Sequence, residues 1–225
     1  MQAEGGASLN DANHADRALR RRCLVLVAVI TSLVLALDVV TKLVAMAQLA
    51  GRPPISLLGG LLTLRLVRNS GAAFGLAQEY TIILSLLAIG VVAVVLRLSK
   101  RLRSVPWAVA FGLLLGGALG NLSDRVFREP GFLRGHVVDF IALPYWPVFN
   151  LADTAVCVAA GLIMVMALRG RRWDGTTDTD PARPDEGAPP PEGEQRTTEP
   201  PERSAPRTVS TRSAIARDVP AVEPE

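Results

Sequence analysis

Four long apolar runs in the first 172 residues limit what this chain can fold into. They cover about residues 23–47, 80–98, 107–122 and 148–168. Each run approaches the roughly 20 residues that a helix needs to cross a bilayer. A core helix of a soluble domain rarely recurs four times at this length and purity. The pattern predicts an all-α integral membrane protein with four transmembrane helices.

The first run has an alternative interpretation as a cleaved signal peptide. It follows the basic stretch ALRRRC, and Ala45-Met46-Ala47 resembles a cleavage site. However, Asp38 and Lys42 interrupt the run before that site, and three more runs follow. A retained helix is therefore the better interpretation. No lipobox precedes either cysteine, so we do not expect the chain itself to be a lipoprotein.

Composition divides the chain into three parts. From Trp173 onward, ten of the 16 prolines, twelve acids and six arginines give a net charge of −6, which leaves +9 for residues 1–172. Such a segment cannot bury enough apolar surface to offset its ordering entropy, so we predict a disordered tail over 173–225. The other parts are a polar, basic N-terminal segment, 1–22, and a membrane domain, 23–172.

Basic residues beside the runs predict their orientation. Arginines stand at 17 and 20–22 before the first run, basic residues fill 97–103 after the second, and arginines close the fourth at 169–172. By the positive-inside rule, both termini and the short turn near residue 100 are cytoplasmic. The segments 48–79 and 123–147 are then extracytoplasmic.

Cysteine and histidine usage excludes several chemistries. Cys23 and Cys157 lie inside apolar runs and are expected to be buried hydrophobic thiols rather than disulfide or zinc residues. The only histidines, His14 and His136, argue against histidine-rich metal sites and against Ser-His or Cys-His catalysis. We expect no metal, no cofactor and no nucleic-acid partner.

Four aspartates are expected at one depth. At 1.5 Å per residue, Asp38, Asp124 and Asp153 each lie about 22 to 25 Å from the cytoplasmic ends of their helices. Asp139 is expected in the outer loop between the last two runs. All four carboxylates would then lie near the outer face of a roughly 30 Å hydrocarbon layer, which is an arrangement typical of a site.

Two of these aspartates have basic neighbours in sequence. Asp38 and Lys42 are spaced to form an i, i+4 ion pair, with the lysine snorkelling toward the interface. Asp124 precedes Arg125, which favours a structural ion pair that shapes the site. Asn121 is placed either to cap or bend the helix end or to hydrogen-bond a substrate backbone.

Asp139 and Asp153 have no basic residue close by in the sequence. If they face each other, repulsion and desolvation raise one pKa, so that the pair shares a proton. An ionised carboxylate would deprotonate a water, and a protonated one would donate to the reacting amide. Two alternatives stay open: a proton- or cation-coupled transporter, and a scaffold whose aspartates pair with Arg125 or Lys42.

The segment before the second run carries a strand pattern. Leucines at 62, 64 and 66 alternate with other residues and lead into Asn69-Ser70-Gly71. This predicts a strand that ends in a turn, within a small amphipathic sheet on the outer membrane surface. An ordinary hairpin without a ligand role fits the pattern equally well.

Five motifs, taken in order, resemble those of the lipoprotein signal peptidases, the type II signal peptidases of bacteria. They are DVVTK (38–42), RNSGAAFG (68–75), GNLSDR (120–125), GHVVDF (135–140) and FNLADTAV (149–156). The likeness covers about residues 23–170. It implies an inner-membrane aspartyl protease that removes signal peptides from prolipoproteins, cutting on the amino side of a diacylglyceryl-modified cysteine.

The resemblance also implies roles for individual residues. Asp139 and Asp153 match the catalytic pair, and a small extracytoplasmic sheet is expected after the first helix. The residues matching the substrate and inhibitor groove are Asn69, Gly71, Asn121, Arg125 and Asn150. Those matching site-shaping positions are Asp38, Lys42 and Asp124. Expected partners are diacylglyceryl prolipoproteins, membrane lipids and the inhibitor globomycin, with a monomer as the default state.

Two features depart from the family pattern. The segment VFREPGFLR, 126–134, is longer than the usual link and is expected to form a small outer loop that alters access or substrate preference. The tail and the first 16 residues lie outside the resemblance. We predict that the tail is dispensable for cleavage.

Overall fold

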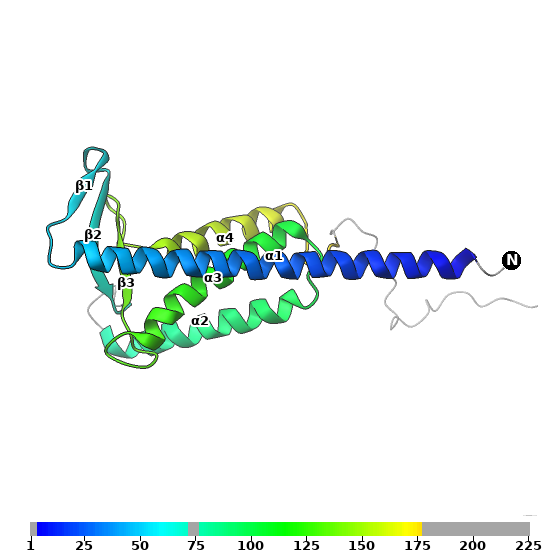
Figure 1. Cartoon of the computed structure of the whole chain (residues 1–225), viewed down its shortest axis with the longest axis horizontal. Helices are drawn as coiled ribbons and strands as arrows, with labels where there is room; N and C mark the ends of the chain where they lie inside the picture. Colours follow the sequence, from blue (N-terminus) through cyan, green and yellow to red (C-terminus); the bar gives the residue numbers. More distant parts are fainter. Residues whose placement is uncertain (1–3, 72–76, 177–225) are drawn as a thin grey trace, which may run out of the picture. The chain divides into compact units, whose positions relative to one another are not determined.

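Four helices and a three-stranded sheet make up the part of the chain that the computed structural model describes, residues 4–71 and 77–176 (Figure 1). All four helices are long and apolar enough to cross a membrane, which confirms the predicted architecture. The helices are α1 (Glu4–Leu49), α2 (Ala77–Ser99), α3 (Val105–Phe127) and α4 (Leu151–Leu168). Many of their leucines and valines face outward, as lipid-facing side chains do.

Helix α1 is much longer than its apolar run. It begins at Glu4, so the expected polar N-terminal segment continues the transmembrane helix beyond the ends of the other three (Figure 1). Extending an existing helix avoids the cost of nucleation, and the alanine- and arginine-rich sequence favours it. An ion pair of 2.7 Å between Arg103 Nε and Asp16 Oδ1 links this extension to the α2–α3 turn.

Helix α3 packs closely against α1 and α4 through a face of glycines. A Cβ at Gly116 would lie 2.6 Å from Val34 Cβ on α1, and one at Gly117 would lie 2.5 Å from the Ala152 carbonyl oxygen on α4. Small residues allow helix backbones to approach closely in membranes, where packing replaces the hydrophobic effect as the driving force. This close approach brings polar groups of three helices within reach of one another.

The sheet lies at the C-terminal end of α1 (Figure 1). Strands β1 (Ile55–Leu57), β2 (Leu62–Asn69) and β3 (Val137–Ala142) are antiparallel in the order β1-β2-β3, and a short 3₁₀ helix, η1 (Leu58–Gly60), links the first two. The predicted strand from Leu62 is confirmed. The expected outer loop around Asp139 is instead partly a strand, because β3 pairs with β2.

The opposite end of the bundle has an apolar core. Trp107 and Phe111 of α3 stack edge to face at 5.5 Å, and Trp107 meets Trp173 in the same way at 6.0 Å. The Trp107 indole donates a hydrogen bond of 3.0 Å to the Arg171 carbonyl, and the Arg103 amide donates one of 2.9 Å to the Trp173 carbonyl. The chain directly after α4 is therefore part of the bundle.

Two details differ from expectation. Cys23 is buried, but Cys157 is exposed on the outer surface of α4, so the prediction of two buried thiols is wrong for Cys157. Helix α3 extends to Phe127, beyond the expected end near Leu122. Its last turns carry polar residues that contact other elements instead of lipid, so hydropathy alone ended the helix too early.

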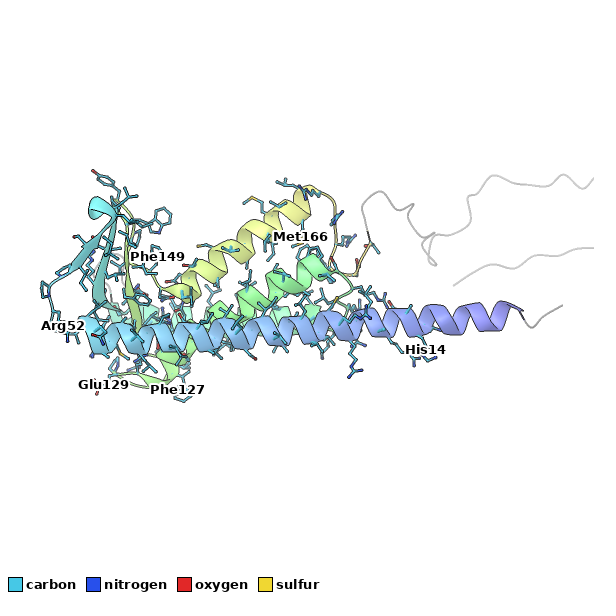
Figure 2. All side chains as sticks on the ribbon, turned by 45° about the horizontal axis from the view of Figure 1, so that its top comes forward. His14, Arg52, Phe127, Glu129, Phe149 and Met166 are labelled. Carbon is cyan, nitrogen blue, oxygen red and sulfur yellow. The ribbon has the colours of Figure 1, made fainter. Side chains whose placement is uncertain are left out.

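Figure 2 shows the positions of the exposed residues that follow. Phe127 and Glu129 lie at the sheet end of the bundle, away from Met166.

Candidate functional site

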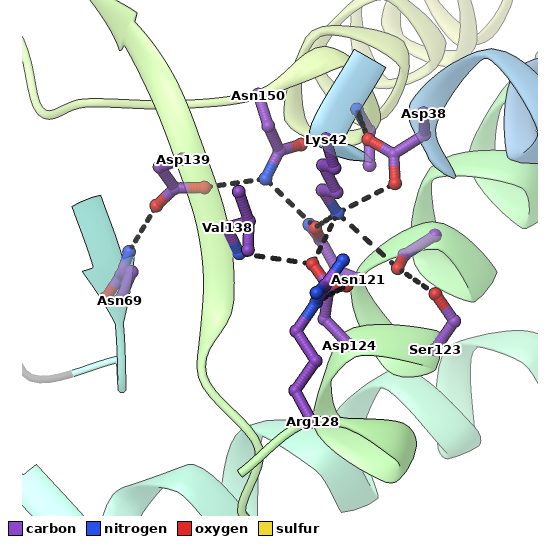
Figure 3. A network of polar contacts seen from close by, with 12 residues as sticks. Asp38, Lys42, Asn69, Asn121, Ser123, Asp124, Arg128, Val138, Asp139 and Asn150 are labelled. Carbon is purple, nitrogen blue, oxygen red and sulfur yellow. Dashed lines mark hydrogen bonds and ion pairs between the residues drawn. The ribbon is translucent and has the colours of Figure 1, made fainter. Parts of the chain in front are cut away.

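A continuous polar network lies between the sheet and the helix ends, within an otherwise apolar bundle (Figure 3). It begins at α1, crosses α3 and the start of α4, and ends at strands β2 and β3. Most of its members are almost completely buried. Buried polar groups are tolerated when they satisfy one another through hydrogen bonds and ion pairs.

Lys42 lies at the centre of the charged half of the network. Its Nζ is 2.7 Å from Asp38 Oδ2 and 2.9 Å from Asp124 Oδ2, and the whole residue is 0% exposed. The expected Asp38–Lys42 pair is thus present, but the lysine does not snorkel, since Asp124 offers it a second carboxylate inside the bundle. Asp124 is further paired with Arg128, one turn along α3. Two cations and two anions balance here.

The same cluster fastens neighbouring elements through backbone amides. Asp38 Oδ1 accepts a hydrogen bond of 3.0 Å from the Ala152 amide at the start of α4. Asp124 Oδ2 accepts one of 3.1 Å from the Val138 amide on β3. The charged cluster therefore positions the two elements that carry Asp153 and Asp139.

Two asparagines connect the charged cluster to these aspartates. Asn121 Oδ1 accepts from Lys42 Nζ at 3.1 Å, and its Nδ2 donates to Asp153 Oδ1 at 2.7 Å. Asn150 Nδ2 donates to Asn121 Oδ1 at 3.1 Å and to Asp139 Oδ1 at 2.6 Å. Asn121 lies inside α3 rather than at its end, so it does not act as a cap.

Asp139 is held on β3 with both carboxylate oxygens engaged. Oδ2 accepts from Asn69 Nδ2 at 2.8 Å, and Oδ1 accepts from Asn150. Asn69 reaches it from β2, where Val67 is the register partner of Asp139. Burial raises the pKa of Asp139 to about 6; the two asparagine hydrogen bonds lower it, and the nearby charge of Asp153 raises it. This carboxyl group can therefore exchange a proton near neutral pH.

Asp153 occupies the first turn of α4. Asn150 is the N-cap: its Oδ1 accepts from the Asp153 amide at 3.0 Å, while Asp153 Oδ2 accepts from the Asn150 amide at 3.1 Å. This reciprocal capping box fixes the carboxylate at the positive end of the helix dipole. Asn150 thus contacts both Asp139 and Asp153, and it sets their relative position.

Arg125 and Gly71 lie together beside the two aspartates. Arg125 is only 9% exposed, and within the described part of the chain its Nη1 has no hydrogen-bond partner. A Cβ at Gly71 would lie 2.4 Å from Leu84 Cδ1 and 3.6 Å from Arg125 Nη2, and its φ of 90° favours glycine. A buried guanidinium nitrogen without a hydrogen-bond partner is costly unless a ligand pairs with it.

The structure brings together nearly all the residues singled out from the sequence. The network brings Asp38, Asp124, Asp139 and Asp153 together, while their common depth in the membrane stays a prediction. One pairing was wrong: Asp124 contacts Lys42 and Arg128, not its sequence neighbour Arg125. Adjacent residues of a helix point in directions about 100° apart, whereas residues four apart share a face.

Sequence reasoning missed two contributors. Arg128 stands four residues after Asp124, so helical spacing was a signal that could have found it. The Val138 amide could not have been found in this way, because its contact with Asp124 depends on how β3 docks on α3.

Fold and network together define an integral membrane protein with two carboxylates, joined through one asparagine, at the sheet end of a four-helix bundle. Such a pair is suited to acid–base hydrolysis. A family model described as Signal peptidase (SPase) II matches residues 30–169. The chain belongs to the signal peptidase II family and is a membrane peptidase.

Curated relatives agree with this assignment. The chain is 46% identical to the lipoprotein signal peptidase of Streptomyces griseus subsp. griseus over 79% of its own length and 90% of the relative's. It is 50% identical to those of Rhodococcus jostii and Mycobacterium avium, over 67% and 71% of this chain and 76% and 86% of theirs.

A solved structure shares the fold. It is a bacterial membrane enzyme determined by the in meso method at 1.9 Å resolution, 28% identical, with a TM-score of 0.57. The match covers 64% of this chain and 92% of that chain. The similarity thus spans nearly the whole of the solved enzyme.

Proposed function

We propose that this protein removes the signal peptide from diacylglyceryl-modified prolipoproteins, cutting on the amino side of the lipidated cysteine, with Asp139 and Asp153 as its catalytic pair. The observation that carries the proposal is Asn150, which binds Asp139 and caps the helix turn that holds Asp153. Membership in a peptidase family favours hydrolysis over ion transport or scaffolding.

The chemistry needs one ionised and one protonated carboxyl group. The ionised member takes a proton from a water, whose oxygen bonds to the scissile carbonyl carbon, while the protonated member gives its proton to the carbonyl oxygen. Collapse of this tetrahedral diol breaks the C–N bond: the carboxyl group that took the water proton gives it to the leaving amine, and the carboxylate that gave up its proton takes one back from a hydroxyl of the diol. Asp139, with its pKa raised to about 6, is suited to exchange that proton.

Substrate binding falls to the residues that surround this pair. Arg125, with its unpartnered buried Nη1, is suited to hold a carbonyl oxygen of the bound peptide. The proposed groove residues are Asn69, Gly71, Asn121, Arg125 and Asn150. Asp38, Lys42 and Asp124 shape the site by fixing α4 and β3. The same groove would bind globomycin.

The proposed location is the bacterial inner membrane, with both termini in the cytoplasm and the site at the extracytoplasmic face. Basic residues at 97–103 and 169–172 flank the helix ends opposite the sheet, which supports this orientation. The scissile bond of a lipid-anchored cysteine lies at the membrane surface, so the carboxylates must lie there too. We expect a monomer that contacts lipids, with residues 23–172 forming the peptidase domain between segments 1–22 and 173–225.

Cleavage assays test the catalytic pair directly. Purified wild type in detergent should process a diacylglyceryl-modified prolipoprotein, and globomycin should block the reaction. Asp139→Asn and Asp153→Asn should each lower the rate about 10²- to 10⁴-fold, since each removes one proton-transfer group. Asp16→Asn, far from the site, is the control and should cleave normally. Folded variants at position 139 or 153 that cleave at the wild-type rate would refute the assignment.

A further inference from the structure

An open cavity of about 700 Å³ lies away from the polar network, between α1 and the first turn of α3. It is lined by Ala18, Arg21, Arg22, Val25, Leu26, Val29 and Val105. Along α1, its nearest lining residue to the network is Val29, about 13 Å from Asp38 at the helical rise. None of the residues proposed for cleavage or substrate binding lines this cavity.

The cavity lining changes character along α1. Arg21 and Arg22 stand immediately before the apolar run that starts at Cys23, and Val25, Leu26 and Val29 follow within the next two turns. Arg21 and Val29 are about 12 Å apart along the axis. This axial distance matches the distance from a lipid phosphate at the membrane surface to the upper part of an acyl chain.

Charge in the cavity has one sign. Within the described part of the chain, the ion pairs involve neither Arg21 nor Arg22, and no acid lines the cavity. Asp16, the acid about one turn earlier on α1, already forms an ion pair with Arg103, with 2.7 Å between Asp16 Oδ1 and Arg103 Nε. The first turn of α3 at Val105 has no side-chain cap, so its free amides add to the positive potential.

The apolar wall opens toward lipid. Val25 is 54%, Val29 56% and Val105 47% exposed, and all three belong to helices that cross the membrane. A soluble anion would leave these side chains without a partner, whereas an acyl chain would cover them. Two guanidinium groups that form no ion pair within the described residues also favour a net negative headgroup over a zwitterionic one.

We propose that this cavity binds one anionic phospholipid, with its phosphate at Arg21 and Arg22 and an acyl chain against Val25, Leu26, Val29 and Val105. The lipid comes from the leaflet opposite the sheet. The inference is independent of the catalytic assignment, because the two sites share no residue.

Native mass spectrometry of the full chain in detergent tests this site. Phosphatidylglycerol and phosphatidylcholine with identical chains are titrated separately. Wild type should bind phosphatidylglycerol about 10-fold or more tightly than phosphatidylcholine. The double variant Arg21→Gln/Arg22→Gln should weaken phosphatidylglycerol binding about 10- to 30-fold, as expected for two interfacial arginines. The matched control Arg17→Gln/Arg20→Gln removes the same charge from the same helix outside the cavity and should change binding less than about 3-fold.

A variant on the apolar wall distinguishes a lipid from a soluble anion. Val29→Trp fills the place of the acyl chain and should weaken binding of both lipids, while water-soluble glycerol phosphate should not displace phosphatidylglycerol. Equal losses in the two arginine variants would overturn the proposal in favour of diffuse surface charge. Displacement by glycerol phosphate, or equal affinity for the two lipids, would overturn it as well. Unchanged thermal unfolding of each variant verifies that it is folded.

Discussion

At the scale of single residues, Asn150 connects the two proposed catalytic aspartates. It caps α4, donates a hydrogen bond to Asp139 and contacts Asn121, and it is 0% exposed. Its amide has both an acceptor and two donors, which the N-cap role alone does not require. This difference allows its structural and catalytic contributions to be separated.

Asn150→Ser should therefore behave differently from Asn150→Ala. Serine retains an oxygen that accepts from the Asp153 amide, but its shorter side chain does not reproduce the amide donor that Asn150 gives to Asp139. Asn150→Ser should therefore be more stable than Asn150→Ala, while its cleavage rate falls at least about 10-fold. Alanine should lose about 1 kcal/mol of stability as well. Thermal unfolding and cleavage rates of both variants check this. Equal unfolding temperatures for the two variants would contradict the capping role.

Asp139 should make stability depend on pH. Its folded pKa of about 6 exceeds the usual value of 3.8, so between these pH values the folded protein binds more protons than the unfolded chain. The free energy of unfolding should then fall as pH rises from about 4 to about 6, by up to about 3 kcal/mol, with no further change from this group above that range.

Thermal unfolding of wild type and Asp139→Asn across this pH range checks the effect. The variant lacks the titrating group, so it should gain stability relative to wild type as pH rises. Glu129→Gln, which removes an exposed carboxylate, is the control and should follow wild type. A constant difference between wild type and Asp139→Asn at all pH values would contradict the raised pKa.

At the scale of elements, the position of α3 between α1 and α4 builds the site. Its glycines let the neighbouring helices approach until Lys42 of α1 reaches both Asn121 and Asp124 of α3. Even Gly120 has a role here, since a Cβ there would lie 2.6 Å from Asp38 Oδ2. The polar network therefore depends on the close packing of these helices.

Gly117→Ala should destabilise the bundle, while Gly161→Ala should not. The new methyl at 117 would lie 2.5 Å from the Ala152 carbonyl oxygen, whereas nothing lies within 4 Å of a Cβ at 161. We expect a loss of about 1–3 kcal/mol for the first and no loss, or a gain of up to about 1 kcal/mol, for the second. Unfolding temperatures in detergent decide this, and equal values would contradict the close packing.

At the scale of the whole molecule, the chain after α4 divides between residues that pack on the bundle and those outside the described part. Trp173 contacts Trp107, and its carbonyl accepts from the Arg103 amide. The tail should therefore be dispensable for cleavage only when the chain keeps these contacts.

Chains ending at Thr176 and at Arg172 should differ in stability. The longer chain should match wild type in unfolding and cleavage, while the shorter one should lose about 1–2 kcal/mol because it lacks the Trp173 contacts. Trp173→Ala in the full-length chain should reproduce most of that loss. A chain ending at Thr176 that folds but does not cleave would show that the tail takes part in the reaction.

Much of the architecture followed from the sequence alone. Four membrane helices, the strand from Leu62 and the set of polar residues that meet in the network were predictable, because hydrophobic length, period-two alternation and helical rise are local properties. The ordered motifs further identified the family. These signals need no knowledge of which elements touch.

Only the tertiary structure decided which polar groups are partners. Lys42 pairs with Asp124 as well as Asp38, Arg128 replaces Arg125, and Asp139 lies on a strand instead of a loop. Each of these contacts depends on elements distant in sequence docking in one register, which local patterns do not encode. A buried charge takes whatever partner the packing brings within reach, since leaving it unpaired costs several kcal/mol.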